Sequence, residues 1–365
     1  MSDLIQALVR PEIAQMSAYQ VPLVPGIEVK LDANESPYAL PETQQRELAK
    51  ALSQIPLNRY PDPQASKLRS ILAAEYEVAE DALLFGNGSD EIIQILLAAL
   101  SNPREGHRRP SILYPGPTFS VFKLLADAHG VDAHCVPLDE NFALDMSALR
   151  AGIAEAEPNI VFFARPNNPT GTLWPASDVL ALASEFPATL FVSDEAYGEY
   201  ATGSLVGERD GRANLLIMKT LSKIGLAGVR VGFAIADPSL ISELNKARAP
   251  YNISALNQAA AVWTLTHCRQ RLRDQCAEVV DQRIRLATEL AGESGIRVFE
   301  SEANLLMFRV GQAGEGKALP LWQRLCDAGI LIRKFGSEGP LADCLRVSIG
   351  TPAENTRFLS ALRGI

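Results

Sequence analysis

Short apolar runs alternate with amphipathic segments along the first 250 residues of the chain. The runs ALLF, SILY, NIVFFA, TLFVS, NLLIMKT and VGFAIA are rich in β-branched or aromatic residues and end at turn residues, which is typical of buried strands. Segments with helical periodicity precede or separate them, among them ETQQRELAKALSQI, SKLRSILAAEY and ASDVLALASEF. Continuous apolar strands that alternate with helices predict an α/β fold with a mostly parallel central sheet and helices on both faces.

The two ends of the chain follow other patterns. The proline-rich stretch SAYQVPLVPGIEVKLDANESPYALP predicts an arm and a loop without a packed element. Past about residue 250, a long charged helix, shorter apolar runs and a final helix indicate a smaller α/β domain. The chain has 365 residues, more than a single core usually supports. We expect an N-terminal arm over 1–40 that packs with the small domain, a large domain over 41–260 and a small domain over 261–365.

The composition narrows the class of protein. Hydrophobic residues make up 47% and charged residues 21% of the chain, as in ordinary globular proteins. A net charge of −9 disfavours a nucleic-acid partner, because binding to phosphate backbones needs basic surface. The five scattered cysteines include no C-x-x-C pair, which disfavours a zinc site or a disulfide framework. Because the N-terminus is polar and no run approaches the length of a membrane span, we expect a cytoplasmic protein.

The residues that follow the predicted strands are candidates for a binding site, since open α/β sheets bind ligands beyond the carboxyl ends of their strands. After ALLF, the turn GNGSDE leads into a helix that we expect Ser89 to cap. The free N–H groups there, at Ser89 and Asp90, suit a phosphate, although an ordinary turn is the alternative. After VFFARP, the segment NNPTG predicts a turn in which Asn168 could also contact a ligand oxygen.

Two charged residues follow the next two predicted strands. Asp194, after TLFVS, is costly to bury unless it meets a partner such as a cationic ring nitrogen, with an N-cap or a salt bridge as alternatives. Tyr197 could reach the same ligand. Lys223, in TLSKIGLAGVRVG, is placed as lysines that form Schiff bases are, although a solvated loop lysine is the common case. With Ser222 and Arg230 as phosphate ligands, the set suggests a pyridoxal phosphate pocket.

The motifs resemble those of the class I (fold-type I) pyridoxal-phosphate aminotransferases, and most closely their histidinol-phosphate branch. The resemblance runs from about residue 19 to the C-terminus. The lysine loop, with NNPTG and DEAY in this order, is specific for the superfamily. LDANESPY and ILIRKF with CLRVSIGT indicate the branch; the other markers are NRYPDP, GNGSDE and YPGPTFS. The resemblance implies the fold-type I transferase fold with a smaller C-terminal α/β domain.

The resemblance also implies roles for residues at matching positions. Lys223 would be the catalytic residue that holds pyridoxal 5'-phosphate and shuttles a proton, and Asp194 would pair with the ring nitrogen. The ring would further meet Asn168 and Tyr197 at its hydroxyl oxygen, and Phe119 on its face, where core packing is the alternative. The phosphate ligands would be Ser89, Asp90, Ser222, Arg230 and, from the partner subunit of a homodimer, Tyr60.

Further matching positions imply a substrate pocket. Arg346 would grip the substrate anion, and Arg333 matches a second anion contact, with a salt bridge at the rim as the alternative. Tyr19, Asn34 and Tyr251 would line the pocket, although both tyrosines could be structural. The chain departs from many relatives in two ways: SKIGLAGVR is one residue shorter, so its backbone must differ locally, and a phenylalanine replaces the tyrosine at the ring-stacking position.

The resemblance implies a reaction as well. An amino group would pass between L-histidinol phosphate and 2-oxoglutarate, giving imidazole acetol phosphate and glutamate, in histidine biosynthesis, with ping-pong kinetics. An aromatic amino-acid aminotransferase or a phosphothreonine-type decarboxylase on the same fold is the alternative, because no motif excludes either. The effector-sensing half of a transcription regulator is disfavoured, because we expect an arm at the N-terminus and the net charge is acidic.

Overall fold

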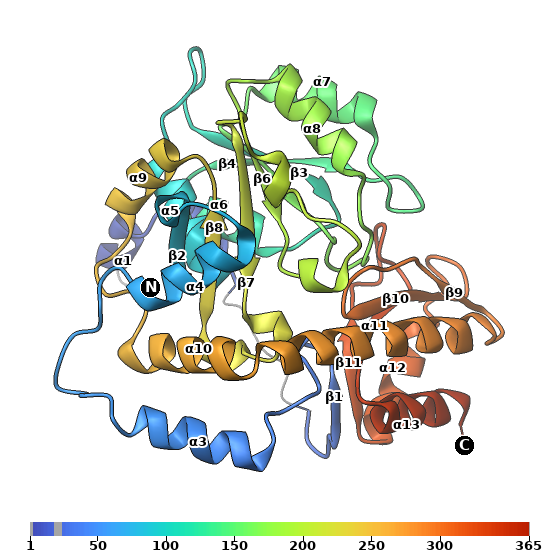
Figure 1. Cartoon of the computed structure of the whole chain (residues 1–365). Coiled ribbons are helices and arrows are strands. Elements are labelled where there is room, and N and C mark those ends of the chain that lie inside the picture. Colours follow the sequence, from blue (N-terminus) through green and yellow to red (C-terminus); the bar gives the residue numbers. More distant parts are fainter. Residues whose placement is uncertain (1–2, 18–23, 365) are drawn as a thin grey trace.

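The computed structural model describes residues 3–17 and 24–364 of the chain. Seven of its strands form a large sheet in the order β2-β8-β7-β6-β5-β3-β4 (Figure 1). β8 is antiparallel to β2 and β7, and the other pairs are parallel. The predicted mostly parallel sheet is therefore confirmed. The strands are β2 (Leu83–Asn87), β3 (Ser111–Gly116), β4 (Asp132–Pro137), β5 (Ile160–Ala164), β6 (Leu190–Asp194), β7 (Leu215–Thr220) and β8 (Val231–Ile235).

Helices cover both faces of the large sheet, because its central strands are apolar on both sides. On β5, Phe162 packs into one buried cluster and Phe163 into the other. The first face is covered by α5 (Ser89–Ala99), α6 (Val121–His129) and α9 (Pro238–Ala247). The second face meets α4 (Ser66–Tyr76), α7 (Met146–Ala156), α8 (Ala176–Glu185), α10 (Ala255–His267) and α11 (Arg269–Ala291).

A second sheet has five strands in the order β1-β11-β12-β10-β9. Four of them come from the last third of the chain, but β1 (Val29–Leu31) pairs in parallel with β11. Val29 and Leu31 are buried there, so the expectation of no packed element in this proline-rich stretch was wrong. The others are β9 (Ile296–Val298), β10 (Leu305–Val310), β11 (Ile330–Lys334) and β12 (Cys344–Ser348), packed with α12 (Ala318–Asp327) and α13 (Pro352–Arg363).

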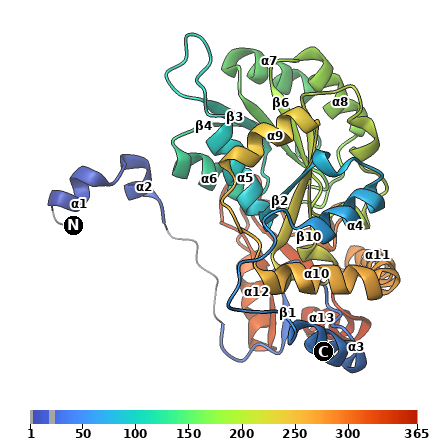
Figure 2. The ribbon, with the colours of Figure 1, turned by 60° about the vertical axis from the view of Figure 1, so that its left-hand side comes forward.

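The N-terminal segments contact both parts of the molecule: α1 (Asp3–Leu8) and α2 (Pro11–Gln15) lie beside the large sheet, whereas β1 belongs to the second sheet. α1 and α2 lie on the side of α6, where Glu12 pairs with Arg109 at 2.7 Å (Figure 2). The bounds of the arm and of the two domains stay predictions. α3 (Glu42–Leu52) packs against α10. Across the described ranges, no helix is both long and apolar enough to cross a membrane.

Candidate active site

The loops after β2, β3, β5, β6 and β7 emerge at one edge of the large sheet, because these strands point the same way. In the register of the sheet, Ala164 at the end of β5 pairs with Asp194, which pairs with Met218 of β7. Arg230 directly precedes the antiparallel β8, so it reaches the same edge. The sequence motifs therefore lie together, as the strand pattern predicted, while their roles in binding remain predictions.

Asp194 is a buried carboxyl at this edge. It is 4% exposed, and burial raises its pKa to about 7. The N–H of Ala196 donates to it at 3.1 Å, while the charges of Asp90 and Glu195 oppose its ionisation and that of Lys223 favours it. A buried carboxyl that is only weakly compensated gains from a cationic hydrogen-bond donor, so the site suits a protonated ring nitrogen.

Lys223 lies beside Tyr197. It sits in the short helix η4 (Ser222–Ile224) after β7. Its Nζ is 3.4 Å from the carbonyl oxygen of Ala33 and 5.7 Å from the ring centroid of Tyr197. The Tyr197 hydroxyl accepts a hydrogen bond from Asn34 Nδ2 at 2.9 Å. A primary amine, a phenol and an amide from three distant segments therefore meet at the sheet edge.

The turn before α5 meets the guanidinium of Arg230. The helix begins at Ser89 with Gly88 as its N-cap, so the expected cap at Ser89 was wrong by one residue. Among the described residues, no side chain caps this end, which leaves its N–H groups for an anion. Arg230 Nη2 lies 3.5 Å from Asp90 Oδ2, and a Cβ on Gly88 would come within 2.5 Å of Nη2. The shortened loop still brings Arg230 to this turn.

Ser222 and Phe119 flank the same edge. Ser222 is buried, and its Oγ accepts a hydrogen bond from Thr220 Oγ1 at 3.0 Å. Phe119 follows β3 and is half-buried, with its ring edge-on to Phe122. One face of a half-buried ring can stack on a flat ligand.

Two arginines stand on neighbouring strands of the small sheet. Arg346 on β12 and Arg333 on β11 are register partners, so both side chains point to one face. Arg346 donates to Asn168 Oδ1 and to the carbonyl oxygen of Asp32, which joins the small sheet to the loop after β5. Within residues 3–17 and 24–364, the side chain of Arg333 has no ion-pair or hydrogen-bond partner. Two neighbouring cations, one of them unpaired, suit an anionic ligand.

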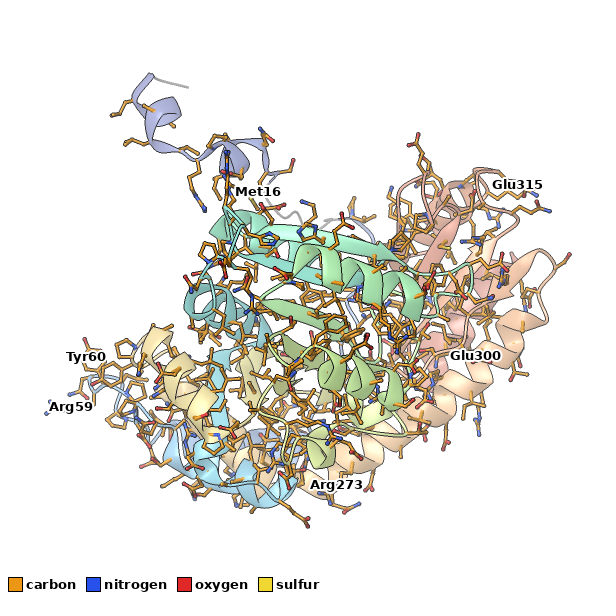
Figure 3. The ribbon with its side chains drawn as sticks, turned by 90° about the horizontal axis from the view of Figure 1, so that it is seen from above. Met16, Arg59, Tyr60, Arg273, Glu300 and Glu315 are labelled. Carbon is orange, nitrogen blue, oxygen red and sulfur yellow. The ribbon has the colours of Figure 1, made fainter. Side chains whose placement is uncertain are left out.

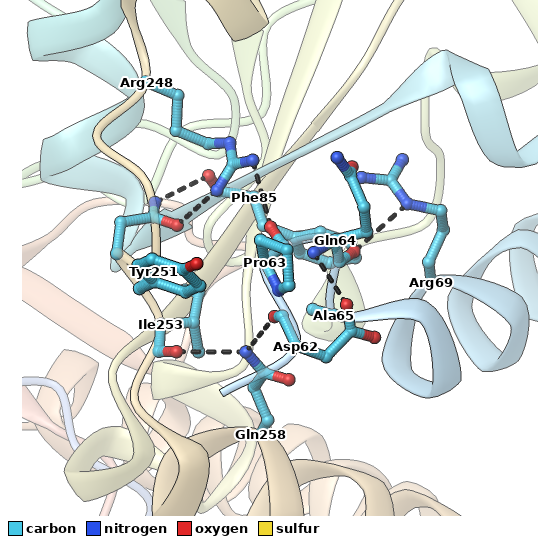
Figure 4. Close-up of a pocket in the computed structure, with 11 residues that line it drawn as sticks. Asp62, Pro63, Gln64, Ala65, Arg69, Phe85, Arg248, Tyr251, Ile253 and Gln258 are labelled. Atoms are coloured by element: carbon cyan, nitrogen blue, oxygen red, sulfur yellow. Dashed lines mark hydrogen bonds between the residues drawn. The ribbon is translucent and has the colours of Figure 1, made fainter. Parts of the chain in front are cut away.

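Tyr60 and Tyr251 form a pair at the surface. Their rings stack at 4.6 Å, with exposures of 81% and 41%, and Figure 3 shows Tyr60 at the outer edge of the molecule. Tyr251 belongs to a small depression that also contains Arg69, Arg248 and Phe85 (Figure 4). In the described part of the chain, neither tyrosine forms a hydrogen bond or ring contact with Lys223 or Asp194. Tyr19 lies outside the described residues.

The sequence interpretation missed several residues that support this edge. Glu195, beside Asp194, accepts from the N–H of Leu205 at 2.7 Å and pairs with Lys219 Nζ at 3.3 Å. Asn304 Nδ2 donates to the carbonyl oxygen of Asn34 at 3.0 Å. Tyr200 donates to the carbonyl oxygen of Lys223. A buried polar residue in a motif was the available signal for Glu195; no local signal indicated the other two.

The arrangement fits pyridoxal phosphate in its chemistry. An amine near a phenol suits an aldehyde that carries a ring hydroxyl, and Asp194 suits the ring nitrogen. The uncapped start of α5, together with Arg230, suits the phosphate. The three features lie on neighbouring loops of a single sheet edge.

Comparisons with known proteins identify the family of the chain. Residues 27–362 match the family described as aminotransferase class I and II. The chain is 42% identical over 364 residues to a histidinol-phosphate aminotransferase of Chromobacterium violaceum, covering 98% of each chain. It is 40% identical over 365 residues to histidinol-phosphate aminotransferase 2 of Cupriavidus pinatubonensis, covering 98% of this chain and 96% of the relative.

A solved structure shows the same fold. Histidinol-phosphate aminotransferase from Sinorhizobium meliloti, in complex with pyridoxal-5'-phosphate, superposes with a TM-score of 0.86 at 24% identity and with 98% of each chain covered. The family match and the two relatives cover nearly the whole chain. This chain therefore belongs to the class I and II aminotransferase family.

Proposed function

We propose that the protein is a pyridoxal-phosphate-dependent transaminase that moves an amino group between L-histidinol phosphate and 2-oxoglutarate. The observation that carries this proposal is the meeting of Lys223 and the buried Asp194 at one sheet edge, facing the start of α5. Relatives named histidinol-phosphate aminotransferase match 98% of the chain at about 40% identity. The product of the step would serve histidine biosynthesis.

The chain's own residues would bind and orient the cofactor, which supplies an electron sink for the substrate carbanion. The Asp194 carboxylate would hold the ring nitrogen in its protonated form. The hydroxyl of Tyr197, already fixed by Asn34 at 2.9 Å, would orient the ring from its other side, together with Asn168. Phe119 would cover one ring face and exclude water from it. The backbone N–H groups of Ser89 and Asp90, with Ser222 and Arg230, would hold the phosphate.

The substrates would be held by residues from both sheets. Lys223 Nζ would accept a proton from the substrate carbon and return it at the neighbouring cofactor carbon, a role that suits a short-range amine base. Arg346 would bind the phosphate of one substrate and a carboxylate of the other, with Arg333 as a second anion contact. Asn34, and Tyr19 outside the described residues, would close the pocket.

The proposal includes a homodimer with shared sites. Its support is the exposed, stacked pair of Tyr60 and Tyr251, which would be covered by a second copy so that Tyr60 reaches the partner's phosphate. We also propose a cytoplasmic location. The five cysteines are free in the structure, which suits a reducing compartment.

An absorbance experiment tests the function. Purified protein with pyridoxal phosphate should show a visible band that L-histidinol phosphate moves to shorter wavelength and 2-oxoglutarate restores. Lys223→Ala should abolish the band, whereas Lys246→Ala, at an exposed lysine on α9 paired with Glu243, should keep it. A wild-type protein without a band would exclude the cofactor. A band that responds only to aromatic amino acids would indicate a sister aminotransferase, and release of carbon dioxide from phosphothreonine would indicate a decarboxylase.

A further inference from the structure

The Tyr200 hydroxyl contacts the main chain of the proposed catalytic lysine. Tyr200 ends η2 (Gly198–Tyr200), the short helix after β6, and is 4% exposed. Its hydroxyl donates to the carbonyl oxygen of Lys223 at 2.5 Å. Across the described ranges, no other hydrogen bond reaches that oxygen. This bond therefore restricts the position of the Lys223 carbonyl oxygen.

Tyr200 is itself held by α11. Arg283 Nη1 on that helix lies 3.4 Å from the carbonyl oxygen of Tyr200 and donates to that of Ala303 at 3.0 Å. The Tyr200 hydroxyl also contacts the Cys276 thiol of α11. Burial raises the pKa of Tyr200 well above its usual range and that of Cys276 to about 11. Both groups stay protonated near neutral pH, so the phenol remains a hydrogen-bond donor.

The segment that carries Tyr200 also contacts the side chain of Lys223. Tyr197 and Tyr200 are three residues apart. The ring of Tyr197 lies 5.7 Å from Lys223 Nζ, while Tyr200 holds the carbonyl oxygen. One short segment of the chain therefore contacts both the main chain and the amine of Lys223. A lysine side chain has many rotamers, so a displaced main chain would spread the amine over several positions.

We propose that Tyr200 is a positioning residue that holds the Lys223 main chain so that the amine meets the carbonyl carbon of the cofactor. This inference rests on the proposed function. The step it serves is a condensation: the Lys223 nitrogen bonds to the aldehyde carbon, the carbonyl oxygen leaves as water, and the amine supplies both hydrogens of that water. The step needs no oxidant or reductant, and its rate depends on how well the amine is placed.

Tyr200→Phe tests the inference, because it keeps the ring and removes only the hydroxyl. Pyridoxal phosphate is added to cofactor-free protein, and the growth of the visible band is followed by stopped flow. We expect the band to form about tenfold more slowly in Y200F, since misplacement of a reacting group has effects of this size or larger. Binding of inorganic phosphate to the cofactor-free protein should be unchanged. In turnover, kcat should fall while KM for both substrates stays within about twofold.

Tyr76→Phe is the matched control. Tyr76 is also a phenol shielded from solvent, and its hydroxyl donates to Glu199 at 2.9 Å. Among the described residues, it forms no hydrogen bond with Lys223. Y76F should form the band at the wild-type rate with a melting temperature close to that of Y200F. Equal rates in wild type, Y76F and Y200F would overturn the inference while leaving the proposed function intact. A wild-type protein that forms no band would overturn both.

Discussion

Asp194 illustrates how the fold can prepare one carboxyl for a ligand. The side chain ends a strand that is buried on both faces, and the nearest hydrogen-bond donor is the N–H of Ala196. Burial without full compensation raises its pKa to about 7. In the cofactor-free protein, ionisation of the Asp194 carboxyl is therefore unfavourable, and a cationic ring nitrogen beside it would offset that cost.

The raised pKa of Asp194 predicts that the free energy of unfolding depends on pH. An acid whose folded pKa lies above its unfolded value, here about 7 against 3.8, contributes stability that is present below the unfolded pKa and lost as pH rises through the folded pKa. Asp194→Asn cannot ionise. From pH 4 to pH 8, the unfolding free energy of the cofactor-free wild type should fall by up to about 4 kcal/mol relative to D194N. Urea unfolding at several pH values measures the difference.

Saturating cofactor is the control for this prediction. Once a ring nitrogen pairs with the carboxylate, the wild type should gain stability over D194N above pH 7. Unfolding curves for the two cofactor-free proteins that keep a constant separation from pH 4 to pH 8 would contradict the account.

At the residue scale, the sequence predicted the residues whose position in the fold follows from their position relative to a strand. Asp194 ends β6 and Lys223 lies in the loop after β7, so their meeting at one edge follows from a parallel sheet. Tyr200 could not be found in this way, because its role depends on which way the Lys223 carbonyl points. Nor could the position of Tyr60 relative to its own site, which depends on a loop.

At the scale of elements, α5 and β8 can lie close together because the residue of β8 at their contact is a glycine. Gly232 on β8 faces the start of α5: a Cβ there would lie 2.4 Å from the N of Ser89 and 2.5 Å from the C of Gly88. Both atoms belong to the backbone and cannot rotate away. The close approach brings the helix N-terminus and Arg230 to the same end of the sheet.

Gly232→Ala should therefore push the start of α5 away from the sheet. We expect a loss of about 3 kcal/mol in the free energy of unfolding, of the size seen for overpacked sites, together with weaker binding of pyridoxal phosphate. Chemical unfolding and a cofactor titration measure the two effects. Gly207→Ala, where no atom of the described residues beyond its chain neighbours lies within 4 Å of the added Cβ, is the control and should change stability by less than about 0.5 kcal/mol. Equal stability of the two variants would refute the steric account.

Alternating helices and strands could be recognised from the sequence because each element carries its own periodicity. β1 could not. It is three residues long, its neighbours include prolines, and its partner β11 lies about 300 positions further on. A strand so short is stabilised by pairing and burial, not by local propensity. The same limit applies to the antiparallel direction of β8, which depends on the path of the connection between Thr220 and Val231.

At the scale of the whole molecule, the proposed dimer makes each site a product of two chains. Tyr60 and Tyr251 are stacked but exposed, and a second copy would bury them. In a closed dimer each protomer would offer Tyr60 to its partner and receive one in return.

Complementation between inactive chains tests this arrangement. Lys223→Ala removes the amine and Tyr60→Ala the shared tyrosine, so each homodimer should be impaired. If equal amounts of the two variants are mixed, unfolded and refolded together, half the dimers combine one chain of each kind. One of the two sites in such a dimer is then intact, and activity should recover to about a quarter of wild type. Mixed chains that stay at the average of the two variants would show that Tyr60 serves its own site.

The position of β1 also constrains the order in which the molecule can assemble on the ribosome. The strands of the large sheet span residues 83–235 and can pair soon after they emerge. β1 emerges before them, yet its partner is complete only at residue 334. At about 5–20 residues per second, the segment waits for roughly 15 to 60 seconds. The middle residue of the segment, Lys30, is charged, and a charged side chain in a short unpaired strand discourages pairing with other nascent chains.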